Sequence, residues 1–167
     1  MACTIHCGSV SSALTEEAAV PFLAGLRAVG GALEHAATTW TGPEPLTVND
    51  HALSFFRRRI AGQRPAFPLL SQMRISSVLL ASADVPGGGV RLAGEDFGDW
   101  EILPLRPVMA EAAAGLRALG ARRPSSARLA GAGRKDTTED DAILLLAALS
   151  AWGSRAAQNG GFLWLIA

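Results

Sequence analysis

The residues of this chain whose type and spacing best suit a chemical role are its arginines. Of the 15 basic residues, only Lys135 is a lysine. A guanidinium group donates a planar fork of hydrogen bonds that fits phosphate and carboxylate oxygens, and clustered arginines can hold a phosphate backbone without reading its sequence. We therefore predict contacts with nucleic acid or with a partner protein through three clusters. They are Arg57, Arg58, Arg59 and Arg64, then Arg122, Arg123 and Arg128, then Arg134 and Lys135.

A plainer interpretation is that the arginines form a solvated surface and pair with the 15 acidic residues of the chain. The formal net charge is zero, which weakens any attraction of the whole molecule to nucleic acid. Three consecutive arginines on a helix spread over about 200° of its circumference. At least one of residues 57–59 is therefore expected to lean toward the boundary of an apolar face, and both interpretations stay open.

The N-terminal segment holds three soft metal ligands, Cys3, His6 and Cys7. If the segment is a strand, the two cysteines share one face and His6 points to the other. A structural zinc site needs four ligands, and the chain supplies only His35 and His51 besides these three. A nucleophilic pair of one thiol with His35 or His51 is formally available. We expect buried structural thiols, with no metal and no cofactor.

Two further patterns are weaker. Residues 131–138, GAGRKDTT, place glycines before a predicted helix start and so partly fit a phosphate loop, but the Walker spacing is absent and acidic residues follow. An acidic patch at a predicted turn could bind a hard cation, although turns also favour Asp for local reasons. Its members are Glu95, Asp96, Asp99 and Glu101. No serine lies in a nucleophile-elbow pattern, so we assign no catalytic residue.

The composition and the cysteine content predict a cytoplasmic protein. Of the 167 residues, 49% are hydrophobic and 18% are charged, whereas about a quarter is typical for charged residues. Either the core is generous or some of the apolar surface faces a partner. Two cysteines are too few for a secreted disulfide scaffold, and the N-terminus lacks the pattern of a signal peptide. The longest apolar run, 142–152, is about half of what a bilayer requires.

Hydrophobic periodicity and turn residues predict one domain over residues 1–167. The expected fold is helix-dominated α+β, with about four helices packed against a small sheet of short strands. Strands are expected over 3–10, 90–93 and 100–105, the last two as a hairpin, and a first helix over 15–40. Residues 75–81 fit a buried strand, but a helix from Pro68 fits nearly as well.

Residues at the ends of the next two helices support this assignment. Asn49 and Asp50 are suited to cap a second helix, which Gly62 and Pro65 would end. Pro107 suits the first position of a third helix, and Gly120 suits its C-terminal end. The second helix would turn one face to the core through Leu53, Phe56 and Ile60.

The C-terminal third predicts a central helix and a buried end. Thr138 and Asp141 approximate a capping box for a fourth helix that is apolar nearly all round over 142–152 and that Asn-Gly-Gly ends at 159–161. Residues 121–136 are predicted to form a mobile loop. The apolar residues 162–167 are expected to be pinned within the fold rather than against a partner.

In general architecture the chain is similar to small helical subunits of nucleoprotein machines, such as those of bacterial RNA-guided interference complexes, and in size to phage head–tail connector proteins. Neither likeness rests on a motif, so no residue roles follow from it. We expect a non-catalytic subunit of a larger assembly, with other protein subunits and nucleic acid as partners and no membrane. The alternatives are a small cysteine- or metal-dependent enzyme, a connector-type structural protein, and a module that binds a small ligand or neutralises a toxin.

Overall fold

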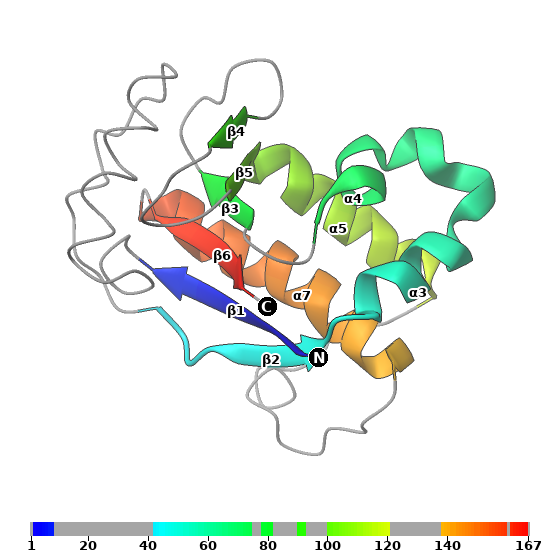
Figure 1. Ribbon diagram of the computed structural model, residues 1–167, viewed down its shortest axis with the longest axis horizontal. Coiled ribbons are helices and arrows are strands. Elements are labelled where there is room, and N and C mark those ends of the chain that lie inside the picture. The colour runs from blue at the N-terminus through cyan, green and yellow to red at the C-terminus, as the bar shows by residue number, and fades with distance from the viewer. Residues whose placement is uncertain are drawn as a thin grey trace.

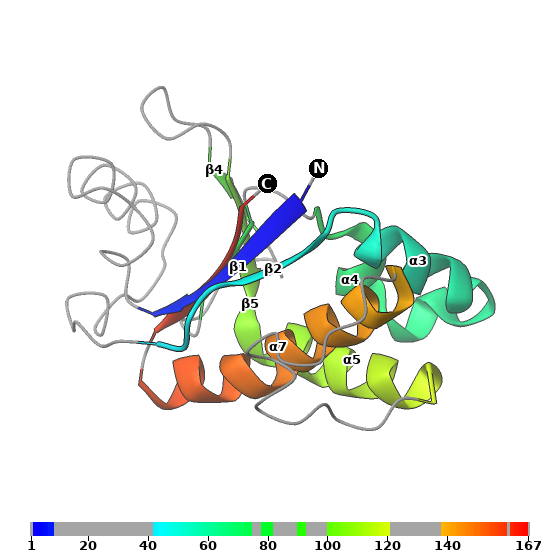
Figure 2. The ribbon, with the colours of Figure 1, turned by 90° about the horizontal axis from the view of Figure 1, so that it is seen from below.

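A computed structural model describes residues 2–8, 42–74, 78–81, 90–92, 100–120, 138–159 and 161–166. These residues form a mixed sheet, and helices cover one of its two faces (Figures 1 and 2). The result is a helix-dominated α+β fold, as the hydrophobic periodicity predicted. Among the described helices, none has both the length and the apolar character needed to cross a membrane.

The described sheet has six strands in the order β2-β1-β6-β3-β5-β4. The strands β3 and β5 run parallel and every other pair is antiparallel. The C-terminal strand β6 lies between β1 and β3, so the prediction that the apolar end is pinned within the fold is confirmed. The bounds are Ala2–Gly8 for β1, Leu46–Asn49 for β2, Val78–Ala81 for β3, Val90–Leu92 for β4, Trp100–Pro104 for β5 and Phe162–Ile166 for β6.

Five described helical elements accompany the sheet. They are α3 (Ala52–Arg59), the 3-10 helix η1 (Ala61–Ala66), α4 (Pro68–Gln72), α5 (Leu105–Ala118) and α7 (Thr138–Gln158). The predicted second, third and fourth helices correspond to α3, α5 and α7. The two alternatives for 68–81 are both present, because a short helix from Pro68 is followed by strand β3.

Three local expectations need correction. The strand β2 was not predicted; it alternates buried and exposed residues and pairs with β1. The helix α5 begins at Leu105, so Pro107 lies within its first turn rather than at its first position; proline is tolerated there because first-turn amides lack intrahelical partners. Pro65 does not end the helical path but lies inside η1. Gly120 has a φ of 65°, which fits its predicted place after the end of α5.

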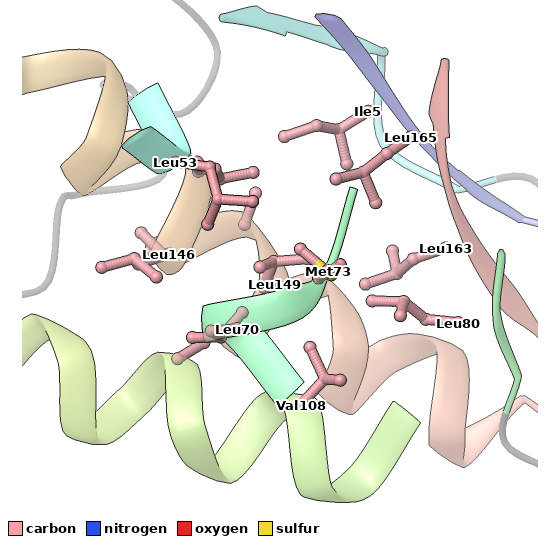
Figure 3. Close-up of a cluster of buried hydrophobic side chains, with 14 of the residues drawn as sticks. Ile5, Leu53, Leu70, Met73, Leu80, Val108, Leu146, Leu149, Leu163 and Leu165 are labelled. Atoms are coloured by element: carbon pink, nitrogen blue, oxygen red, sulfur yellow. The ribbon is translucent and has the colours of Figure 1, made fainter. Parts of the chain in front are cut away.

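Helix α7 is the centre of the core. It packs against α5, α3 and the inner side chains of strands β1, β2 and β6, and every residue from Leu144 to Ser150 is buried. Figure 3 shows Leu146 and Leu149 of this helix among side chains from the sheet and from α3, α4 and α5. A Cβ on Gly153 would come within 2.5 Å of Met109 Cγ, so the glycine permits the close approach of α7 and α5.

Buried side chains also lie on the second face of the sheet. His6, Trp164, Leu79 and Ile102 stand side by side in register across four adjacent strands. The last three are fully buried, and the Trp164 ring lies 5.4 Å from that of Phe162. The sheet is therefore apolar on both faces, which explains why β3 and β6 are continuous hydrophobic runs rather than alternating ones.

Several expectations lie outside the described residues. They are the helix over 15–40, the turn over 94–98, the mobile loop over 121–136, and the phosphate-loop pattern except for its last residue. His35 and three members of the acidic patch, Glu95, Asp96 and Asp99, also lie outside them.

Candidate anion-binding surface

The segment that contains α3, η1 and α4 has an unusual charge pattern. Residues 51–74 contain five arginines and no acidic residue. Figure 2 shows these elements at one end of the molecule, where they extend beyond the sheet. The exposed residues of this end carry positive charge although the chain as a whole is neutral. A local rather than a global electrostatic attraction is therefore available here.

Arg57 is used within the protein. Its Nε donates to Leu70 O at 2.9 Å and its Nη2 donates to Met73 O. These carbonyls lie at and beyond the end of α4, where backbone acceptors have no partner in the helix. Burial lowers the pKa of the half-buried Arg57, Arg64 lowers it further, and Glu101 raises it. Arg57 is thus the arginine of the triplet that leans toward the apolar face.

The other end of α4 is capped by an acidic side chain. Glu111 of α5 accepts hydrogen bonds from Leu69 N at 3.0 Å and from Leu70 N at 2.8 Å, one to each carboxylate oxygen. A carboxylate at a helix N-terminus and a guanidinium at its C-terminus both match the helix dipole. Two opposite charges from neighbouring helices therefore fix a helix of only five residues.

Between α3 and α4, η1 forms an exposed tip. All six of its residues are exposed, while the residues on either side, Ile60 and Phe67, are 1% and 3% exposed. The ring of Phe67 meets Phe56 edge to face, with centroids 5.4 Å apart. The tip is consequently anchored at both ends and presents Arg64 to solvent.

Three of the predicted contact arginines at this end are exposed. Arg58, Arg59 and Arg64 are exposed, and none of them forms an ion pair with a carboxylate of the described residues. Arg59 Cζ lies 6.0 Å from the ring centroid of Phe55, one helical turn earlier. We call Arg58, Arg59 and Arg64 the arginine surface. It provides several hydrogen-bond donors without a nearby negative charge on its own segment.

Of the other predicted contact residues, Arg122, Arg123, Arg128, Arg134 and Lys135 lie outside the described residues. Sequence reasoning did not single out Arg74, which is exposed at the end of the same segment and whose backbone N donates to Glu101 Oε2 at 3.2 Å. The absence of acidic residues from 51–74 is the sequence signal that would have identified the whole segment, including Arg74, as a positively charged surface.

The N-terminal cysteines face the core, as the strand periodicity predicted. Burial raises the pKa of Cys3 to about 11 and that of Cys7 to about 12. The Cys7 thiol donates to Trp152 O over 3.6 Å, whereas His6 lies on the opposite face of β1. Burial thus disfavours the thiolate, which is the form that attacks as a nucleophile or binds a metal. No cluster of three or more metal-ligating side chains occurs in the described part of the chain.

The remaining polar groups near this end stabilise the fold. Asp141, buried in the first turn of α7, accepts a hydrogen bond from Asn49 N at 2.6 Å. Asn49 Oδ1 in turn accepts from His51 N at 2.8 Å, just before α3. His51 itself is exposed, with Nε2 3.7 Å from Asp50 Oδ1. These bonds join the end of β2 to the starts of α3 and α7 and so fix the position of the arginine surface.

No family model matches this chain, and no curated protein or solved structure shows significant similarity to it. Fold and surface together define a helix-dominated α+β protein with an anchored arginine surface at its helical end.

Proposed function

We propose that this protein is a non-catalytic subunit of a cytoplasmic nucleoprotein assembly, of the kind found in RNA-guided complexes, and that its arginine surface contacts a nucleic-acid backbone. The observation that carries the proposal is the exposure of Arg58, Arg59 and Arg64 without a described carboxylate partner, on a segment that has no acidic residue. Arginines so placed can bind phosphate oxygens directly.

The neutral net charge supports a subunit role rather than an independent nucleic-acid binder. Through the three arginines of this surface, the isolated chain would contact about three phosphates and bind weakly, because affinity and its salt dependence grow with the number of phosphates neutralised. Other protein subunits would supply the rest of the binding surface. The high apolar content, 49% of the residues, is consistent with contacts to such subunits.

The test measures binding of labelled oligonucleotides by fluorescence anisotropy at increasing salt, for the wild-type chain and for two charge-matched double variants. Arg58→Gln with Arg59→Gln removes two charges from the arginine surface, and Arg106→Gln with Arg155→Gln removes two exposed charges elsewhere. We expect the first double variant to lose most of the affinity and to lower the salt slope by about 1.4 to 1.8, at roughly 0.7 to 0.9 per phosphate. The second is expected to bind like the wild type.

Equal losses in both double variants would overturn the proposal, because they would indicate general charge attraction. So would a wild-type chain that binds no oligonucleotide at low salt. Competition by polyglutamate at the same concentration of negative charge would instead assign the arginine surface to an acidic protein.

A further inference from the structure

Next to the arginine surface, α3 carries one aromatic side chain that is only partly buried and that packs against the edge of the core. Phe55 is partly exposed on α3, whereas its neighbour Phe56 is fully buried. Arg58 and Arg59 follow Phe55 by three and four residues, so both flank it on the helix surface. Arg59 Cζ lies over the Phe55 ring, 6.0 Å from its centroid.

This combination fits one chemical class of ligand. A phenyl ring offers a face on which a planar base can stack, and guanidinium groups beside it can bind the phosphate of the same nucleotide. In a duplex the base faces are already stacked on each other, so a ring on the protein surface finds no base face to cover. An unpaired strand exposes base and phosphate together.

We infer that Phe55, Arg58 and Arg59 form a stacking platform for single-stranded nucleic acid, with Arg64 on the adjacent tip binding a neighbouring phosphate. The inference rests on the proposed function and narrows its ligand to unpaired strands. The platform is firmly held, because Arg57 on the same helix ties α3 to the end of α4 and Ile60 anchors the start of η1. Its contacts are independent of base identity, since every base has a stacking face.

An acidic peptide is the competing ligand of the same surface. Carboxylates would satisfy the arginines but would gain nothing from the ring. Dependence on Phe55 therefore distinguishes a nucleotide strand from an acidic protein segment, and dependence on bases distinguishes stacking from simple charge attraction.

The experiment compares three probes on the unmodified full chain: a labelled oligothymidylate, an abasic oligonucleotide with the same number of phosphates, and a duplex of equal length. We expect the oligothymidylate to bind on the order of tenfold more tightly than the abasic strand and more tightly than the duplex. Equal affinity for the oligothymidylate and the abasic strand would overturn the inference without the use of any variant.

Variants of Phe55 supply the second arm. Phe55→Leu keeps an apolar side chain and is expected to weaken oligothymidylate binding about tenfold while leaving binding to the abasic strand unchanged. Phe55→Trp restores a ring and is expected to restore binding. If Phe55→Leu has no effect while the Arg58, Arg59 double variant loses binding, the stacking platform is refuted and the proposed function stands. If the wild type binds none of the probes, both fail.

Discussion

Raising the pH should destabilise this protein through its two buried thiols. Burial raises the pKa of Cys3 from 9.0 to about 11 and that of Cys7 from 9.0 to about 12. Because both folded-state values lie above the unfolded ones, the unfolded chain releases protons first as the pH rises. The stabilising contribution is therefore complete below pH 9 and is lost progressively above it.

The size of the effect follows from the same shifts. Between pH 9 and 11 each thiol removes about 1.4 kcal/mol of stability per pH unit, so the pair should lower the free energy of unfolding by about 3 kcal/mol at pH 10. That loss is a large fraction of the roughly 5–15 kcal/mol typical of a folded domain. Few other side chains titrate between pH 9 and 11, because the chain has no tyrosine and a single lysine.

Urea unfolding followed by circular dichroism at pH 7, 8, 9 and 10 measures this loss directly. The control is the double variant Cys3→Ala, Cys7→Ala, which should be less stable at pH 7 but should lose much less stability between pH 8 and 10. Alkylation of the native wild type at pH 8 should also be slow, with a rate set by unfolding. Rapid alkylation of the native protein, or a free energy of unfolding that stays constant to pH 10, would show that the thiols are not buried as described. Either result would favour the alternative function, a cysteine-dependent enzyme.

Two further predictions concern the charged caps of α4. Glu111→Ala should lower the free energy of unfolding by about 2–3 kcal/mol, since it leaves the amide of the fully buried Leu70 without its acceptor. Glu139→Ala, at an exposed acid, should cost under about 1 kcal/mol in the same urea titration. Arg57→Met should cost about 2 kcal/mol and Arg58→Met less than about 0.5 kcal/mol; equal costs for the two arginines would contradict their assigned roles.

Much of the fold could be predicted because its signals are local. The hairpin of β4 and β5 and the all-apolar helix α7 each follow from a periodicity that one segment carries by itself. Strand β2 differs. It has only four residues, which follow two prolines and precede a turn, and it becomes a strand by pairing with β1. A short segment of this kind becomes a strand through its partner rather than through its own propensity.

The sequence pointed to the arginine cluster at residues 57–64, but it did not show which of these arginines bonds within the protein and which are exposed. The sequence indicated that one residue of the arginine triplet would lean toward the apolar face, and Arg57 does so. It could not show that the free carbonyls of α4 lie within reach of that side chain, because this depends on how α3 and α4 pack. Phe55, in contrast, lies off the stripe of Leu53, Phe56 and Ile60, so its exposure was accessible to sequence reasoning.

The fold accounts for one arginine of the triplet but not for the next two. A cation in the last turn of α3 complements the helix dipole by about 0.3–1 kcal/mol, and Arg57 already lies in that turn and hydrogen-bonds two carbonyls. Arg58 and Arg59 add charge beside it, and adjacent like charges repel. Replacing both by Gln relieves this repulsion but removes the Arg59–Phe55 contact and two cations that also lie in the last turn. The free energy of unfolding should therefore change by less than about 1 kcal/mol. Two exposed cations that contribute little to stability, beside a partly buried aromatic ring, suit a surface whose counter-charge comes from a ligand.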